Sequence, residues 1–398
     1  MPWLETDAMK ERRRLIEDWL SGDYSKTELA RVYGVSRKTV HTVLSRFDSE
    51  GWRAVEERSR APQGHARAVA AAIERRVVEA RGKHPSWGPK KLKAWLGRQD
   101  GGVSWPAAST IGGILDRHGL TVHRGRRRLT TKWSGDLQRC TAANVVWGID
   151  FKGWFRLGDG RRCEPLSLSD LHSRYILRLV ALQRPTSAAA WAILEGAFRE
   201  FGLPLVLRSD NGQPFAGPGL CGLSQLAVKV IKAGVTPERI APGKPQQNGR
   251  QERLHLTVQQ DTASPPAATW RGQQRRLAMF VREFNEERPH EALAQTPPAQ
   301  HYAPSPRLYG GRLRDPEYGP QIEVRRVHPH GTVRWAGQAV FVSQALAGEW
   351  VGLEPTERDG VMRLRFGHMP LAMLKADGKL EPLAGARARQ RPSIVQKV

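Results

Sequence analysis

Apolar residues recur at helical spacing near the start of the chain and predict three short helices over residues 9–52. In the first, Leu15, Ile16 and Trp19 share one face. Ser25 and Glu28 have the spacing of a capping box that opens the second helix, and a tight turn at residues 34–36 leads into the third. The small core of this unit is predicted to contain Ala30, Gly34, Val35, Val40 and Leu44. The pattern is typical of a helix-turn-helix.

The polar face of the third helix supplies the candidate DNA contacts of this unit. Cationic, hydroxyl and imidazole side chains there suit base edges and phosphates in a major groove. The residues expected to face outward are Arg37, Lys38, Thr39, His41, Thr42 and Arg46. The alternative is an ordinary three-helix bundle with a solvated basic face. The turn and the chain's excess of basic residues favour DNA binding.

A second helical module is predicted over residues 68–128, after a polar linker at residues 57–67. Its amphipathic segments cover residues 68–81, 88–99 and 104–120, and Ser104 is the candidate N-cap of the last. Basic side chains on the middle segment and after the module are Lys90, Lys91, Arg124, Arg126, Arg127 and Arg128. We expect them to contact DNA phosphates, although the arginine run also suits a solvated linker.

From about residue 144 the spacing of apolar residues changes from the period of a helix to that of a strand. Strand-like runs at residues 145–157, 163–171 and 174–182 precede a helix over residues 186–201 and a short apolar strand at residues 203–207. The pattern predicts an α/β domain. Three strands, a crossover helix and a fourth strand match the beginning of an RNase H-like fold, but periodicity alone does not select that fold over other α/β arrangements.

The last part of the chain alternates apolar and polar residues with a period of two. After a proline-rich connection at residues 296–306, this alternation and the turn glycines over residues 318–383 predict a small β-barrel. The basic tail at residues 384–398 is predicted to be disordered. The chain is therefore expected to be multidomain, with helical modules at residues 1–56 and 68–128, an α/β core at residues 140–305 and the barrel.

Charge narrows the partners of such a chain. The 63 Lys and Arg residues exceed the 39 Asp and Glu residues, giving a formal net charge of +24. This excess indicates a polyanion, and nucleic acid is favoured over a ribosomal or membrane-surface role. The three scattered cysteines form neither a disulfide framework nor a zinc pattern. With no secretory signal and no apolar stretch long enough to span a bilayer, we expect a cytoplasmic protein that works on double-stranded DNA and not at a membrane.

Three acidic residues lie where a structural role explains them poorly. Asp150 interrupts an apolar strand, Asp210 follows another, and Glu252 lies on a helix that begins after Pro245. On that helix one face would carry Asn248, Glu252, His255 and Gln259. Carboxylates that converge from separate elements repel each other unless a cation joins them, and two Mg²⁺ ions, with Mn²⁺ as a substitute, suit oxygen ligands and phosphoryl chemistry.

Other acidic, histidine and tryptophan residues near this core have simpler interpretations. Glu238 competes with Glu252 as third carboxylate but lies before the helix, and Asp170 suits a turn at a strand end. A lone histidine is more often structural than a metal ligand, so neither His255 nor His290 is assigned to metal. The tryptophans expected to fill the core are Trp147, Trp154 and Trp191.

Four motifs in order carry a family resemblance. WGIDFK at residues 147–152, SDNGQPF at 209–215, PQQNGRQER at 245–253 and FNEERPHEALAQTP at 284–297 resemble the integrase-core DDE transposases of bacterial insertion sequences, relatives of retroviral integrases. The resemblance covers residues 140–305, and the paired helical modules before it agree with that family. It implies an RNase H-like core and metal ligands at Asp150, Asp210 and Glu252.

The resemblance also implies roles for other motif residues. Asn211 and Gly212 match the turn that exposes the second aspartate, and Asn248 and Arg253 match positions near the substrate DNA. The later signature contains Arg288, Pro289 and His290, which we expect to brace the core rather than touch DNA. One departure is an excess of residues between Asp210 and Glu252, which falls at residues 216–225.

The function implied is that of a transposase that binds terminal inverted repeats, cleaves the ends with metal-activated water and joins the 3′-OH to target DNA as a dimer or larger assembly. Two alternatives stay open. A DNA-binding regulator with an inactive core explains the charge but not the acidic triad. An RNase H-like nuclease explains the triad but not two sequence-reading modules.

Overall fold

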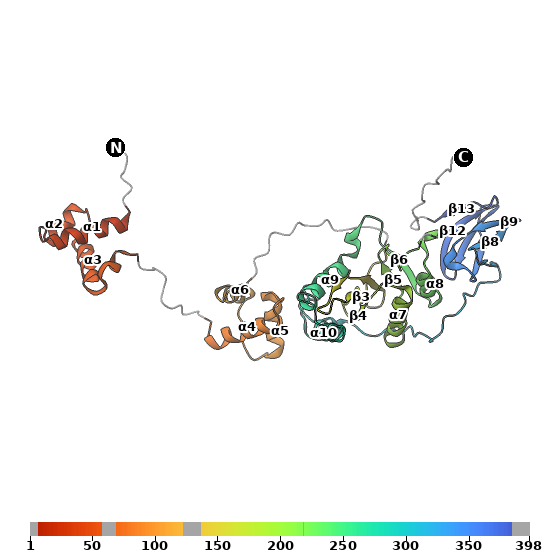
Figure 1. Cartoon of the computed structure of the whole chain (residues 1–398), viewed down its shortest axis with the longest axis horizontal. Coiled ribbons are helices and arrows are strands. Elements are labelled where there is room, and N and C mark those ends of the chain that lie inside the picture. The colour runs from red at the N-terminus through yellow and green to blue at the C-terminus, as the bar shows by residue number, and fades with distance from the viewer. Residues whose placement is uncertain (1–6, 58–68, 122–136, 218, 384–398) are drawn as a thin grey trace, which may run out of the picture. The chain divides into compact units, whose positions relative to one another are not determined.

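The chain divides into two units, Met1–Ala70 and Ala71–Val398, in the computed structural model, which describes residues 7–57, 69–121, 137–217 and 219–383 (Figure 1). The first unit contains α1 (Ala8–Ser21), α2 (Lys26–Val32), α3 (Arg37–Glu50) and a 3-10 turn, η1 (Gly51–Val55). The predicted capping box is present, since Ser25 and Glu28 exchange hydrogen bonds across the start of α2. Gly34 is exposed rather than part of the core, because its φ of +62° places it in the turn.

The second helical module contains α4 (Ala71–Lys83), α5 (Pro89–Gln99) and α6 (Ala108–Arg117). Their apolar faces enclose Trp87, Leu92, Leu96, Ile111 and Ile114, all buried. The predicted cap of the last helix is wrong, because α6 begins four residues after Ser104 and its N-cap is Ala107. Trp105 Nε1 donates to the carbonyl of Asp100, so this stretch connects α5 to α6 instead of extending α6.

A mixed sheet forms the centre of the second unit. Its strands are β1 (Val146–Phe151), β2 (Phe155–Arg156), β3 (Arg162–Asp170), β4 (Ile176–Leu182), β5 (Val206–Ser209) and β6 (Thr236–Arg239). β3 pairs antiparallel with β1, β2 and β4, whereas β5 is parallel to β1 and β6 is parallel to β5. This order is RNase H-like, so the predicted α/β fold class is confirmed for this domain.

Helices cover both faces of this sheet (Figure 1). On one face, α7 (Ser187–Phe201) and α8 (Gln225–Lys232) pack on Trp147 and Ile149 of β1. On the other lie α9 (Gly249–Thr262) and α10 (Trp270–Arg282), which follow a 3-10 turn, η3 (Pro245–Asn248). Because side chains alternate along a strand, Gly148 and Asp150 point toward α9. A π-helical turn, η4 (Glu283–Glu287), and 3-10 turns η5 (Glu291–Leu293) and η6 (Pro298–His301) follow α10.

The C-terminal strands form an open sheet and a hairpin. The sheet contains β7 (Glu323–Arg326), β10 (Trp350–Pro355), β11 (Val361–Phe366), β12 (Met369–Lys375) and β13 (Leu380–Pro382), and the hairpin β8 (Thr332–Trp335) and β9 (Gln338–Phe341) precedes a 3-10 turn, η7 (Gln344–Leu346). Across residues 319–383 no pairing joins β13 to β7, so the predicted closed barrel is corrected to an open sheet. Alternation specifies strands and faces, but closure depends on strand tilt and stagger, which a local pattern does not encode.

The apolar face of this C-terminal sheet is covered by the α/β core. Val351, Leu353 and Phe366 share one buried cluster with Val228 and Ile231 of α8. Cys221, in a 3-10 turn η2 (Leu220–Gly222), lies in the same cluster, and its thiol donates to the carbonyl of Leu371. Cys221 and Leu223, within the extra segment, therefore form part of the surface on which the C-terminal sheet packs.

Candidate active site

Asp150 and Asp210 lie at the same level on neighbouring parallel strands. Gly148 of β1 is paired with Arg208 of β5, and each aspartate follows two residues later on its own chain segment. Adjacent strands are about 4.8 Å apart, so this register brings the two carboxylates together at the carboxyl ends of the strands. The structure thus places side by side two of the three acidic residues that the sequence singled out.

Helix α9 crosses this end of the sheet at close range. A Cβ at Gly148 would lie 2.7 Å from the Nε2 atom of the buried Gln251, so a larger residue there would force the Gln251 side chain to move. Asn248 Nδ2 donates to Asp150 Oδ2 at 2.7 Å, and His255 Nδ1 lies 3.9 Å from the same oxygen. The predicted helix face therefore does look onto β1, and Asn248, predicted as a DNA contact, donates to the Asp150 carboxylate.

The electrostatics of Asp150 are those of a carboxylate short of positive charge. Burial, followed by repulsion from Asp210, raises the pKa of Asp150 to about 7, even though the hydrogen bond from Asn248 opposes the shift. Glu252 adds a smaller repulsion. Burial and the nearby ammonium of Lys152 lower the pKa of His255 to about 4, so His255 is neutral near pH 7 and does not compensate Asp150.

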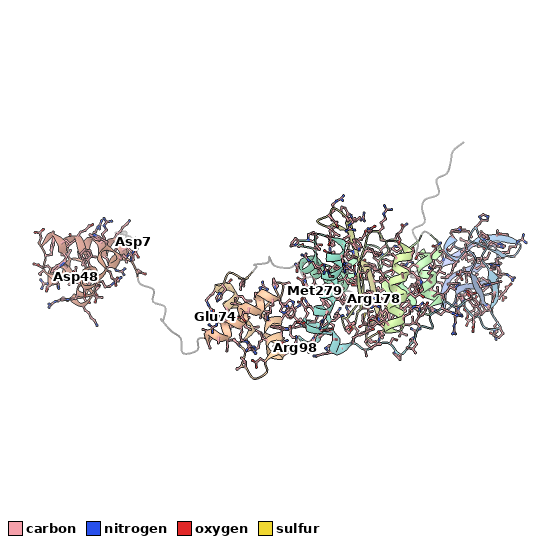
Figure 2. The ribbon with its side chains drawn as sticks, turned by 60° about the horizontal axis from the view of Figure 1, so that its bottom comes forward. Asp7, Asp48, Glu74, Arg98, Arg178 and Met279 are labelled. Carbon is pink, nitrogen blue, oxygen red and sulfur yellow. The ribbon has the colours of Figure 1, made fainter. Side chains whose placement is uncertain are left out.

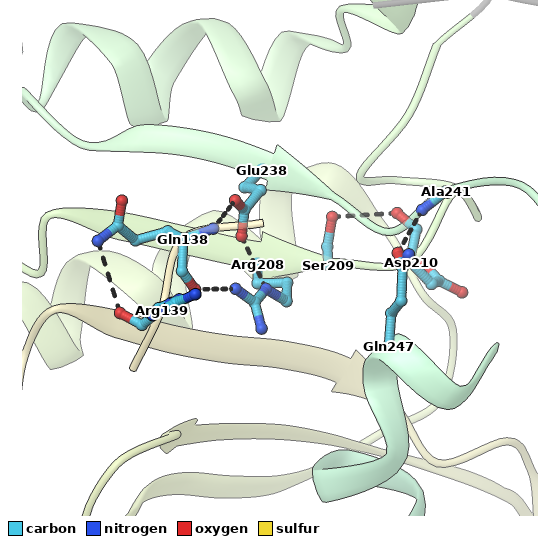
Figure 3. Close-up of polar contacts among 8 residues, drawn as sticks. All are labelled: Gln138, Arg139, Arg208, Ser209, Asp210, Glu238, Ala241 and Gln247. Carbon is cyan, nitrogen blue, oxygen red and sulfur yellow. Dashed lines mark hydrogen bonds and ion pairs between the residues drawn. The ribbon is translucent and has the colours of Figure 1, made fainter. Parts of the chain in front are cut away.

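Motif residues around Asp210 connect the surrounding loops. Gly212 N donates to Asp210 Oδ1 at 3.0 Å, and a Cβ at residue 212 would come within 3.0 Å of the other carboxylate oxygen. Asn211 Nδ2 donates to the carbonyl of Ile240, and Gln247 accepts from Ala241 N (Figure 3). These bonds tie the turn after β5 and the start of α9 to the segment after β6.

Glu238 and Asp170, the other acidic residues considered, are engaged in structural contacts. Glu238 lies within β6, where it accepts from Arg208 Nε at 2.7 Å and from Gln138 N at 2.7 Å (Figure 3). Asp170 is fully buried at the end of β3, where it accepts from Ser173 and Asn144. Both carboxylates are used by the fold, as was predicted for Asp170.

The side chains at this site suit a divalent cation. Asp150 and Asp210 supply hard oxygen ligands, and a cation between them would offset the burial and the repulsion that raise the pKa of Asp150. Across the described residues, no three acidic, histidine or cysteine side chains are grouped closely enough to hold one ion together. Glu252 is exposed on α9, and its charge contributes to the repulsion that raises the pKa of Asp150.

The candidate DNA contacts of the helical modules differ in their exposure to solvent. On α3, Arg37, Lys38, Thr39, His41 and Thr42 are exposed. Arg46, which was predicted to face outward with them, is half-buried and donates to the carbonyl of Glu56. The four predicted arginines, Arg124, Arg126, Arg127 and Arg128, lie outside the described residues.

The second module packs against the later signature of the core. Arg98, labelled in Figure 2, donates to the carbonyls of Glu287 and Gln295 at 2.7 and 2.9 Å. His84 Nδ1 lies 2.9 Å from Glu283 Oε1, and exposed Lys90 pairs with Glu291. Lys90 and its neighbour Lys91 are therefore close to the catalytic core rather than on a separate surface.

Arg288 and His290 brace this junction, as predicted. Arg288 is buried, pairs with Asp261 of α9 at 2.9 Å and lies over the rings of Trp87 and Phe284. His290 packs edge-on against Phe284. The prediction that Trp154 fills the core, in contrast, is wrong.

Among the three tryptophans, Trp147 is fully buried and Trp191 packs against the core, whereas Trp154 is 54% exposed. Gly153, with a φ of +85°, turns the chain at the end of β1, and Trp154 contacts the Arg162 guanidinium. The sequence did not single out Arg174, in the turn between β3 and β4, or Arg250, on α9. Arg174 adopts a φ of +67°, which no local pattern signals in a non-glycine residue.

Comparison with known families agrees with this architecture. Residues 12–115 match the family described as Homeodomain-like domain, residues 233–298 match Integrase core domain, and residues 322–377 match IS481 family transposase, C-terminal domain. The integrase-core match contains α9 and the later signature.

Two relatives belong to bacterial insertion elements. An uncharacterized protein of insertion element IS407 from Burkholderia multivorans is 27% identical over 281 residues, which cover 70% of this chain and 91% of that protein. An uncharacterized protein of insertion element IS476 from Xanthomonas euvesicatoria is 26% identical over 236 residues, covering 58% of this chain and 65% of that protein.

Two solved structures that this chain matches come from retroviruses. The catalytic core of HTLV-2 integrase, determined with magnesium, is 16% identical with a TM-score of 0.31, and the match covers 42% of this chain and all of that one. A simian T-cell lymphotropic virus intasome bound to a PP2A regulatory subunit is 14% identical with a TM-score of 0.35, covering 74% of this chain and 97% of that one.

The sheet topology and the family matches define a protein of the integrase-core class, whose members are polynucleotidyl transferases. Within that class, the matches together support an insertion-sequence transposase with N-terminal helix-turn-helix modules. Within the described part of the chain, no helix is long and apolar enough to cross a membrane.

Proposed function

We propose that this transposase binds the terminal inverted repeats of its element, cleaves one strand at each end and joins the resulting 3′-OH to target DNA. The observation that carries the proposal is the convergence of Asp150 and Asp210 at the ends of β1 and β5, under the α9 face that bears Glu252. The two ends of the element must meet, so we propose a dimer or larger assembly on DNA in the cytoplasm.

The chain's own residues would prepare this site before DNA arrives. Asn248 orients the Asp150 carboxylate through one oxygen, and Gly212 N orients Asp210. Glu252 completes the ligand set after rotation toward them. When bound, two Mg²⁺ ions, or Mn²⁺ in their place, would activate the attacking oxygen and stabilise the leaving one. Phosphoryl transfer then depends mainly on positioning and charge stabilisation, which such a site supplies.

Substrate selection would come from the exposed face of α3. Its donors, from Arg37 to Thr42, have the residue types that read base edges, while the second module and the arginine run at residues 124–128 hold phosphates. This division predicts that loss of a carboxylate affects cleavage without affecting recognition of the ends.

The test compares carboxylate variants on labelled DNA that carries an end of the element. Asp150→Asn, Asp210→Asn and Glu252→Gln are each expected to abolish Mg²⁺-dependent cleavage and to leave end binding largely intact. Asp159→Asn, on the exposed turn between β2 and β3, is the matched control and should cleave normally. Retained cleavage in any of the three variants would refute that ligand assignment.

The same assay separates the two alternative functions. A regulator with an inactive core would bind the ends without cleaving them under any metal condition. An RNase H-like nuclease would cleave RNA–DNA hybrids irrespective of the end sequence. Cleavage confined to end DNA supports the transposase.

A further inference from the structure

A cavity of about 450 Å³ lies where the second helical module meets the catalytic core. Its wall is formed by α5, the turn between β3 and β4, the flank of α9 and the segment from Phe284 to Ala292. Five cationic side chains line it: Lys91, Arg174, Arg250, Arg253 and Arg288. The only carboxylates among its described lining residues are Asp170 and Glu291.

The two carboxylates balance only part of the charge of the five cations. Asp170 accepts four hydrogen bonds, from His172 N, Asn144 N and both the N–H and the hydroxyl of Ser173. Glu291 pairs with Lys90, which lies outside the cavity lining. Arg288 is compensated by Asp261 of α9, with which it pairs at 2.9 Å. The cavity therefore carries an excess of positive charge.

Arg174 is the cation least satisfied by the protein. Its backbone is in the left-handed region, with a φ of +67°, which directs the side chain from the β3–β4 turn toward the cavity. Among the described residues, no hydrogen bond or ion pair engages its guanidinium, although the side chain is partly buried. A half-buried guanidinium without an anion is costly unless a ligand supplies one.

The electrostatics of two neighbours agree with this picture. Burial, together with repulsion from Arg288 and Arg253, lowers the pKa of Lys91 to about 8. Burial and the adjacent Arg250 lower the pKa of Arg174 to about 10. Both shifts mean that the charged forms are disfavoured in the absence of a bound anion, and that an anion would bind more tightly than it would on a solvated surface.

We propose that this cavity is a binding site for a backbone phosphate of the substrate DNA, held jointly by the second helical module through Lys91 and by the core through Arg174 and Arg250. The identity of the anion rests on the proposed function. A DNA phosphate is favoured over a free anion because α9 forms both this wall and the carboxylate site, with Arg253 directly after Glu252. Guanidinium groups match phosphate oxygens in a bidentate geometry.

The first experiment measures binding of a labelled duplex carrying one end of the element to the full-length chain, without Mg²⁺, over a range of salt concentrations. Arg174→Gln is expected to weaken binding about tenfold, the loss typical of a charge-assisted hydrogen bond, and to lower the slope of log K against log salt by about one. Arg282→Gln removes the same charge from the exposed side of α10 and should change neither quantity appreciably. Equal losses in the two variants would overturn the site.

The second experiment locates the phosphate. Single methylphosphonate linkages, which remove one phosphate charge each, are placed along the duplex. At one position the substitution should weaken binding of the unaltered protein about tenfold but leave the Arg174→Gln variant unaffected, because both changes remove one contact. The same loss in both proteins at every position contradicts the proposal. Arg174→Lys, which keeps the charge, should retain most of the binding and shows that the effect is not misfolding.

A third measurement tells whether the cavity binds a free anion or a DNA phosphate. The design also keeps a failure of the phosphate site separate from a failure of the proposed function. Thermal stabilisation by inorganic phosphate over chloride at equal ionic strength, lost in Arg174→Gln while DNA binding stays unchanged, would assign the cavity to a free anion and overturn the DNA assignment. Because all binding is measured without Mg²⁺, failure of the carboxylate variants to lose cleavage would refute the proposed function while leaving the phosphate site standing.

Discussion

The contacts of Glu238 lead to a prediction that separates structural from catalytic carboxylates. Arg208 is only 6% exposed, and its Nε donates to Glu238 Oε2 at 2.7 Å, while its Nη2 donates to the carbonyl of Gln138 at 2.6 Å. Glu238→Ala removes the only carboxylate paired with this buried guanidinium in the described structure, together with the acceptor for Gln138 N. Glu252→Ala, in contrast, truncates an exposed side chain on α9.

The expected magnitudes differ because one change leaves a buried charge uncompensated. Breaking one partner of a buried ion pair costs about 3–5 kcal/mol of unfolding free energy. Since the Glu238 side chain is 17% exposed and Arg208 keeps its bond to Gln138, we expect the lower end, about 3 kcal/mol. That corresponds to a fall in Tm of about 4–5 °C, at about 2.1 cal/mol/K of unfolding entropy per residue of the unit Ala71–Val398. Glu252→Ala should change the free energy of unfolding by no more than about 0.5 kcal/mol.

The assay pairs thermal unfolding with cleavage of end DNA below the melting transition. Glu238→Ala should melt early and still cleave, whereas Glu252→Ala should melt normally and not cleave. Arg208→Met combined with Glu238→Leu should recover much of the lost stability, because no buried charge is left unpaired. If Glu238→Ala melts like the unaltered protein and is inactive, the structural assignment of Glu238 is wrong and it becomes the better third ligand.

Three further predictions concern the shared core, pH and metal. Leu353→Ala, in the cluster shared with α8, should lower the free energy of unfolding by about 2–5 kcal/mol in one cooperative transition; a separate, unaffected core transition in calorimetry would contradict this. Burial lowers the pKa of His290 to about 3. Below pH 6.5 the unfolded chain therefore binds a proton at His290 that the folded chain does not bind. The free energy of unfolding should fall with decreasing pH by about 1.4 kcal/mol per pH unit from this group. His290→Asn should flatten that slope between pH 6.5 and 5 in denaturant titrations, and an unchanged slope argues against it. Saturating Mg²⁺ should raise the Tm of the unaltered protein but not of Asp150→Asn, with removal by EDTA reversing the shift; equal shifts in both would exclude Asp150 as a ligand.

Much of the local architecture was predictable because it depends on neighbours in sequence. The capping box at Ser25 and Glu28, the strand that carries Asp150 and the helix that ends at Gly202 follow from periodicity, side-chain size and backbone preference. The α9 face was also predictable, because i, i+4 and i+7 positions share a side of any helix. Periodicity left the order of the core strands open. The resemblance carried by the four motifs implied that order, because it implied an RNase H-like fold.

Other features depended on partners distant in sequence. Arg46 points inward because Glu56 offers it a carbonyl, and Trp154 points outward because Gly153 turns the chain before it. The C-terminal alternation predicted strands correctly but not their closure, since α8 covers the apolar face that a barrel would have enclosed. No local pattern distinguishes these outcomes.

The sequence by itself determined which segments are helices and strands, which carboxylates interrupt them and that the chain is basic enough to need a polyanion. Only the tertiary structure decided which acidic residues are free for chemistry, because Glu238 and Glu252 differ in what surrounds them and not in type. It also gathered Lys91, Arg174 and Arg250 around one cavity. Such groupings arise when strands and helices pack across many residues of chain, and the strength of each charge then depends on the burial and partners that the packing creates.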